Sequence, residues 1–170
     1  MEVSNTMSAI KFFPSKSYSI RRYTLARGDA EIGQIDCGGP GGAAAITIGG
    51  TTCTPVTDSV LRGKFHLDVN GTRIASAQSV GIWRRYFTVQ AGEKSYTLKQ
   101  ASWFGRRFAL LDDGAEVGRI GVTNALSGRC SAELPDDLPP EMQAFLIWLV
   151  ISTWRRAATT AVVAGTMAGR

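Results

Sequence analysis

Residues 139–156 read PPEMQAFLIWLVISTWRR, and they carry the clearest helix signal in the chain. Proline is tolerated in a first helical turn, where backbone N–H groups have no intrahelical partner. Acidic residues lie at the start of this stretch and arginines at its end, which matches the polarity of a helix dipole. No residue from 144 to 151 is polar, so the helix has no face suited to water. We therefore predict a helix over about 139–156, with Phe145, Trp148 and Leu149 in a protein core.

A membrane span is the alternative for a helix that is apolar on all sides. The uncharged run covers only residues 142–154, whereas a spanning helix needs about 20 apolar residues. We therefore expect the rest of the chain to enclose this helix.

The chain before the helix repeats a β-hairpin unit. Each unit has an aromatic residue, an aliphatic residue two positions later, and an apolar residue seven positions after that. Asn70-Gly71 and Asp113-Gly114 separate the two halves of their units, and such pairs favour two-residue hairpin turns. The copies are Tyr23/Leu25/Ile32, Phe65/Leu67/Ile74, Phe87/Val89/Tyr96 and Phe108/Leu110/Val117, with a weaker copy at Ala44/Ile46/Cys53.

The repeat predicts about twelve strands. Five hairpins, a last strand at about 127–134 and a short strand at 10–13, within an N-terminal segment 1–14, supply them. Residues 32–35 and 117–120 both follow the pattern Ile/Val-Gly-x-Ile, and a glycine bulge in each would turn both apolar residues toward the core. The barrel is expected to span 15–156, and the small residues of 157–170 predict a flexible tail.

The bore of a barrel with about twelve strands matches the width of one helix. Strands lie about 4.8 Å apart and tilt by roughly 40° in barrels, so about twelve close into a ring roughly 24 Å across. Inward side chains leave a bore of roughly 12 Å, close to the width of an α-helix with its side chains. We therefore predict a mainly β protein, a closed antiparallel barrel around the C-terminal helix.

This combination resembles the tubby-like barrel superfamily. Residues 138–150 and the Ile-Gly-x-Ile hairpins are most similar to its phospholipid scramblase-like and LURP-one-related branches, and the similarity covers roughly residues 16–156. The resemblance implies a barrel around a central helix. It also implies phosphoinositide binding, as in tubby domains, or calcium-dependent lipid movement, as in scramblases. The acidic calcium-binding segment of scramblases has no counterpart after Trp154, where Arg155 and Arg156 follow.

Reactive residues are scattered along the sequence and do not predict an enzyme. His66 is the only histidine and alternates with Phe65 and Leu67, which predicts an outward position on a strand. Cys37, Cys53 and Cys130 fit neither a disulfide framework nor zinc spacing, and buried free thiols are expected. We expect no catalytic residue, no metal and no cofactor.

Basic residues precede the first strand of each aromatic copy. Because the hairpins repeat, these positions should share one end of the barrel, and the acidic hairpin tips should share the other. The net charge of +5 favours contact with anionic surfaces. The residues predicted to bind a lipid or another anion are Arg84, Arg85, Arg106, Arg107, Arg155 and Arg156, with Arg21, Arg22, Arg62 and Lys64 at equivalent strand starts.

We therefore predict a non-catalytic module that binds anionic phospholipid headgroups at a membrane surface. A structural or protein-interaction domain without a lipid ligand is the alternative. Nucleic-acid binding is disfavoured because the aromatics fall at core positions and leave no stacking platform. The first residues lack a charged region followed by an apolar run, and the thiols suit a reducing compartment, so a cytoplasmic location is expected.

Overall fold

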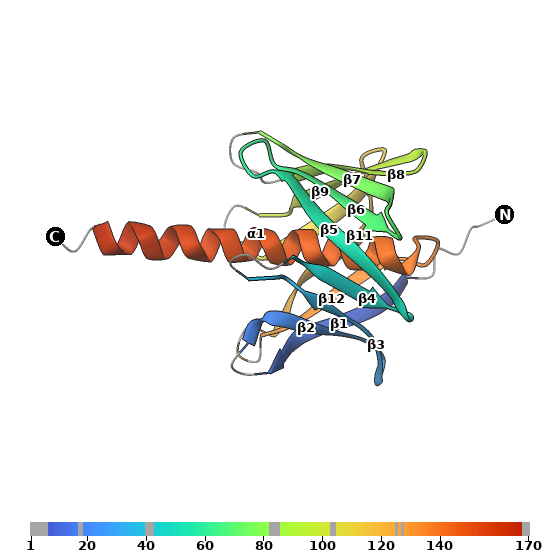
Figure 1. Ribbon diagram of the computed structural model, residues 1–170, viewed down its shortest axis with the longest axis horizontal. Helices are drawn as coiled ribbons and strands as arrows, with labels where there is room; N and C mark the ends of the chain where they lie inside the picture. Colours follow the sequence, from blue (N-terminus) through green and yellow to red (C-terminus); the bar gives the residue numbers. More distant parts are fainter. Residues whose placement is uncertain are drawn as a thin grey trace.

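A closed antiparallel barrel surrounds one C-terminal helix, as the sequence predicts (Figure 1). The computed structural model describes residues 7–16, 19–39, 43–81, 86–102, 105–124, 126 and 128–167. Each strand pairs with its neighbours in sequence, and β1 closes the barrel against β12. The elements are β1 (Met7–Lys16), β2 (Ser19–Arg27), β3 (Ala30–Asp36), β4 (Ala45–Ile48), β5 (Thr51–Ser59), β6 (Lys64–Val69), β7 (Thr72–Val80), β8 (Tyr86–Ala91), β9 (Lys94–Gln100), β10 (Arg107–Asp112), β11 (Ala115–Asn124), β12 (Arg129–Pro135) and α1 (Pro140–Met167).

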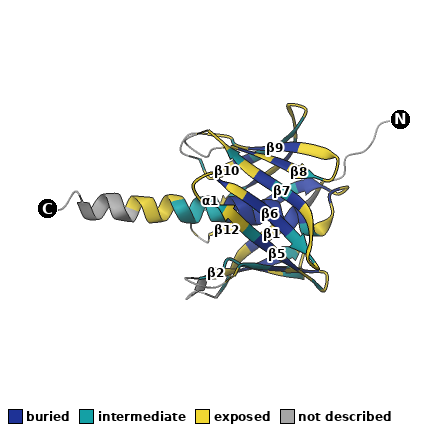
Figure 2. Cartoon of the chain, turned by 45° about the horizontal axis from the view of Figure 1, so that its top comes forward, coloured by how far each residue is buried: buried dark blue, intermediate teal, exposed yellow. Residues whose placement is uncertain are grey.

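The aromatic and aliphatic residues of the repeat line the inside of the barrel. In β10, Phe108 and Leu110 are fully buried, and Phe65 and Leu67 occupy the equivalent buried positions in β6. Alternation along each strand therefore places one face in the core, and Figure 2 shows the buried positions gathered around the helix.

Helix α1 fills the centre of the barrel. Every residue from Ala144 to Ile151 is buried, and none is more than 4% exposed. Phe145 stacks on Trp148 with ring centroids 5.9 Å apart, and Trp148 meets the ring of Phe65 edge-on at 5.8 Å. An all-apolar helix is stable here because strands surround it on every side, as Figure 1 shows.

Gln143 fixes the start of the helix. It is only 2% exposed, and its side-chain amide donates from Nε2 to the Pro135 carbonyl at 3.0 Å. Its Oε1 accepts a hydrogen bond from Arg27 at 3.1 Å. At the surface, Lys94 pairs with Asp137 at 3.1 Å and ties the β8–β9 hairpin to the same turn. A buried amide with both ends bonded sets the depth at which the helix enters.

The two predicted hairpin turns have the expected backbone. Asn70 and Gly71 have φ of 52° and 78°, and Asp113 and Gly114 have 47° and 83°. Positive φ at both central residues is the signature of a type I′ turn, whose twist matches that of the paired strands.

The predicted bulges are present next to Gly33 and Gly118. The β2–β3 register steps from Leu25↔Gly33 to Ala26↔Glu31, which leaves Ile32 unopposed. The β10–β11 register skips Val117 in the same way. Ile32 and Val117 are half-buried against the core, and Ile35 and Ile120 are fully buried. A third bulge skips Ile74, which remains 37% exposed.

Gly33 is required by close approach of β4. A Cβ at this position would clash with the carbonyl oxygen of Thr47 and lie 3.0 Å from the Cα of Ile48. Gly33→Ala should therefore lower the free energy of unfolding by about 1–3 kcal/mol, as overpacking does elsewhere. Urea denaturation measures the change. Gln34→Ala, on the exposed neighbouring residue, should shift stability by less than about 0.5 kcal/mol. Equal stability of the two variants would contradict a close β3–β4 contact at Gly33.

Two predicted boundaries were wrong, whereas the last strand lies within two residues of its predicted bounds. Helix α1 continues to Met167 instead of ending near residue 156. Thr159 and Thr160 bond back to the carbonyls of Arg155 and Arg156 at 3.0 Å, and the alanines beside them have high helix propensity. The helix thus projects beyond the barrel, with Ala157–Ala161 exposed (Figure 2). The N-terminal strand runs from Met7 to Lys16 and belongs to the barrel, while β12 covers Arg129–Pro135.

Candidate anion-binding end of the barrel

Basic residues surround the opening through which α1 leaves the barrel. Strands β2, β6 and β10 run in the same direction, because consecutive strands are antiparallel. Their starts therefore share one end, which we call the basic end. The described side chains there are Arg21, Arg22, Arg62, Lys64, Arg106 and Arg107, all exposed, together with the half-buried Arg155 and Arg156 of the helix. Arg84 and Arg85, predicted at the equivalent strand start, lie outside the described residues.

Two pockets and the hydroxyl of Tyr23 indicate which of these arginines lie near one another. Arg155 and Arg156 line a pocket of about 420 Å³, and Arg106 and Arg107 line another of about 410 Å³. The positive charges of Arg155 and Arg106 both affect the pKa of the Tyr23 hydroxyl. Burial raises the pKa of Tyr23, and these two positive charges oppose that rise. The helix arginines and the β10 arginines therefore flank one opening.

Arg22 at the basic end is paired with an acidic residue. Arg22 contacts Asp36 at 3.2 Å. The pKa of Asp36 is lowered, first by a hydrogen bond from the Gly38 backbone N–H and then by Arg22. Asp36 therefore remains ionised at neutral pH and offsets part of the positive charge. Because both partners are exposed, this pair contributes little to stability.

The thiols near the opening do not add negative charge. Burial raises the pKa of Cys130 to about 11, although the charge of Arg106 opposes it. Burial also raises the pKa of Cys37, against a hydrogen bond and the charge of Arg155. Both groups are neutral at pH 7, so they leave the field of the arginines intact. A neutral thiol is also a poor nucleophile, which gives no support to cysteine chemistry here.

The two helix arginines are held by their neighbours. The guanidinium carbon of Arg156 lies 5.0 Å from the centroid of the Phe65 ring, in a cation–π arrangement. Arg155 acts on the Cys37 thiol by hydrogen bonding, as its effect on the pKa of that thiol indicates. These contacts present both charges at the opening with less conformational freedom than a surface arginine has.

The opposite end of the barrel is acidic. Asp29, Glu93 and Asp113 are exposed at hairpin tips, and Asp136 and Asp137 are exposed where the helix enters. The sequence predicted this separation of charge along the barrel axis.

His66 is less accessible than the sequence indicated. It points away from the core, as expected from its alternation with Phe65 and Leu67, yet it is only 6% exposed. Its Nδ1 lies 2.7 Å from Asp58, and its Nε2 lies 3.3 Å from Asp68. The outward direction was predicted, but the covering of the ring by side chains from β5 and β6 was not. Within the described residues, no group of three His, Cys, Asp or Glu side chains, the one around His66 included, has the arrangement that a metal ion requires.

Sequence reasoning missed the aromatic residues of the opening. Tyr23, Arg106 and Trp154 line a pocket of about 620 Å³ beside the helix. Trp154 stacks on Phe12 with centroids 6.2 Å apart. The position of Trp154, just before the two arginines and at the end of the apolar run, was the signal that could have placed it at the opening.

Comparison with models of known protein families, with curated proteins and with solved structures finds no match. Among the described residues, no helix combines the length and the apolar character needed to cross a membrane.

Proposed function

We propose that this chain is a non-catalytic, intracellular tubby-like barrel whose basic end binds anionic phospholipid headgroups at a membrane surface. One observation carries the proposal: exposed Arg62, Lys64, Arg106 and Arg107 surround the same opening as Arg155 and Arg156. Its link to the tubby-like superfamily, and to the LURP-one-related and scramblase-like branches, rests on the resemblance in sequence and on a compatible barrel.

The strength of the interaction can be bounded. An exposed basic residue close to an anionic membrane contributes about 1 kcal/mol, and the attraction fades within a Debye length. Four exposed basic residues together contribute roughly 4 kcal/mol at low salt, which corresponds to a dissociation constant of about 1 mM. Because the acidic end would be repelled, the barrel should approach the membrane with its basic end first.

Co-sedimentation with vesicles tests the proposal. The wild-type protein should pellet with phosphatidylserine or phosphoinositide vesicles at low salt and be released at high salt, whereas phosphatidylcholine vesicles should leave it in the supernatant. Counterion screening is the reason for the salt effect. Failure to bind any anionic vesicle at low salt would reject lipid binding and favour the structural or protein-interaction alternative.

A further inference from the structure

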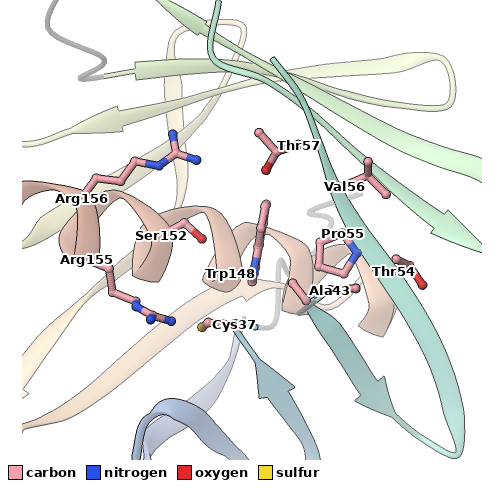
Figure 3. A pocket seen from close by; sticks show the side chains of 11 residues that line it. Cys37, Ala43, Thr54, Pro55, Val56, Thr57, Trp148, Ser152, Arg155 and Arg156 are labelled. Carbon is pink, nitrogen blue, oxygen red and sulfur yellow. The ribbon is translucent and has the colours of Figure 1, made fainter. Parts of the chain in front are cut away.

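The pocket of about 420 Å³ at the basic end lies between β5 and the side of α1 that leaves the barrel. Figure 3 shows Trp148, Ser152, Arg155 and Arg156 on its helix side, and Pro55 and Thr57 on its strand side. Its size lies within the range of small-molecule sites, roughly 300–1,000 Å³. The exposed arginines of the strand starts do not line it, so it is a separate feature of this end.

Trp148, which lines the pocket, carries a buried donor without an acceptor. Trp148 is 4% exposed, and its indole Nε1 has no hydrogen-bond partner among the described residues. Buried indole N–H groups usually find an acceptor, because leaving a donor unsatisfied costs stability. The nitrogen is covered in the structure, so a ligand oxygen must displace neighbouring atoms to reach it, and the hydrogen bond formed would remove that cost. The stacking of Trp148 on Phe145 fixes the direction of the ring and therefore of the donor.

The remaining lining selects the chemistry of the ligand. Arg155 and Arg156 supply two positive charges, one held near Cys37 and the other over the Phe65 ring. Pro55, on the strand side, and Ala44 supply apolar surface. Charge and apolar surface thus lie within one cavity. Such a lining favours a molecule that has an oxyanion at one end and a short apolar stem.

We propose that this pocket binds a small amphiphilic acid, with its oxyanion at Arg155 and Arg156, an oxygen accepting from Trp148, and its stem against Pro55. The same chemistry occurs in a free organic acid and in the phosphate and ester end of a membrane lipid. This binding does not require the exposed arginines to dock on a membrane, and it goes beyond the function proposed above.

The indole resonance of Trp148 provides a direct measurement in the wild-type chain. Protein labelled with ¹⁵N at tryptophan is titrated with octanoate, and the Nε1–H signal of Trp148 is followed by NMR. A saturable shift of this signal is expected, while the Trp154 signal should move little. Inorganic phosphate and 1-octanol each provide half of the chemistry and should need at least tenfold higher concentrations. An unmoved Trp148 signal with every acid tested, or octanol as effective as octanoate, would overturn the proposal.

Matched variants separate the donor from the charges. Trp148→Phe keeps an aromatic ring but removes the N–H, and it should weaken octanoate binding about fivefold to tenfold. Trp154→Phe makes the same change in the neighbouring pocket and should leave the affinity within about twofold. Arg155→Gln with Arg156→Gln should weaken binding by more than tenfold. Equal affinities of wild type and the double arginine variant would overturn the assignment. If Trp148→Phe does not fold, the wild-type titration decides.

Two further arms identify the source and separate this site from membrane docking. Dihexanoyl phosphatidic acid, below its critical micelle concentration, represents the lipid. If dihexanoyl phosphatidic acid binds more tightly than octanoate, the ligand is a membrane lipid. If octanoate binds more tightly, the ligand is a free organic acid. Trp148→Phe retains every basic residue, so it should still sediment with phosphatidylserine vesicles although its pocket is impaired. Weakened octanoate binding with intact vesicle binding supports a separate pocket, whereas equal octanoate affinity in wild type and Trp148→Phe would overturn the proposal.

Discussion

Trp148→Ala should lower the free energy of unfolding by about 3–5 kcal/mol, the range measured for removing a large aromatic side chain from a core. The indole is 4% exposed and contacts the rings of Phe145 and Phe65. Truncation would leave a cavity between the helix and the strands, which the closed barrel can collapse only partly. Urea denaturation followed by circular dichroism measures the loss.

Leu61→Ala is the control for this experiment. Leu61 is 92% exposed, so its truncation should change stability by less than about 0.5 kcal/mol. A Trp148→Ala protein with the stability of the wild type would show that α1 does not fill the barrel.

The barrel could be predicted because its repeat is local. Each hairpin carries its own turn signal and its own inward pair, such as Phe108 and Leu110 before Asp113-Gly114. The strand number then followed from counting units, and the bulges from Gly33 and Gly118. The helix could be placed inside because residues 144–151 have no polar side to expose.

The helix end and the environment of His66 could not be predicted. Past residue 156 the chain leaves the barrel, so no apolar pattern marks its conformation, and helix propensity together with the threonine back-bonds continues α1 to Met167. His66 is covered by Asp58 on the neighbouring strand. That contact depends on strand register, which an isolated sequence pattern does not give.

The candidate site was predictable in position but not in detail. Basic residues precede equivalent strands of the repeat. This pattern predicted that Arg106 and Arg107 lie at one end of the barrel. The pairing of Arg22 with Asp36 depends on β2–β3 register, and the pocket beside Trp148 depends on how α1 meets β5. Such features arise from packing between segments that are distant in sequence.

Charge reversal at the basic end should produce the largest change in function. The variant replaces Arg62, Lys64, Arg106 and Arg107 with Glu. All four side chains are exposed, so the fold should survive. Removing four contributions of about 1 kcal/mol each weakens vesicle binding by roughly a thousandfold, and the new negative charges add repulsion. Binding should therefore fall below detection at low salt.

A matched pair of variants controls for net charge. Arg106→Glu with Arg107→Glu changes two charges at the basic end. Lys11→Glu with Lys94→Glu makes the same change on the barrel wall and at the acidic end, where both residues are exposed. The second variant also loses the surface pair between Lys94 and Asp137, which contributes at most about 1 kcal/mol to stability.

The most direct measurement is co-sedimentation of these two double variants with phosphatidylserine vesicles at the same low salt concentration. If the basic end faces the membrane, Arg106→Glu/Arg107→Glu should lose at least tenfold in affinity, while Lys11→Glu/Lys94→Glu should stay within about threefold of the wild type. Equal losses in the two variants would show that only net charge matters, and they would contradict a binding surface at the basic end.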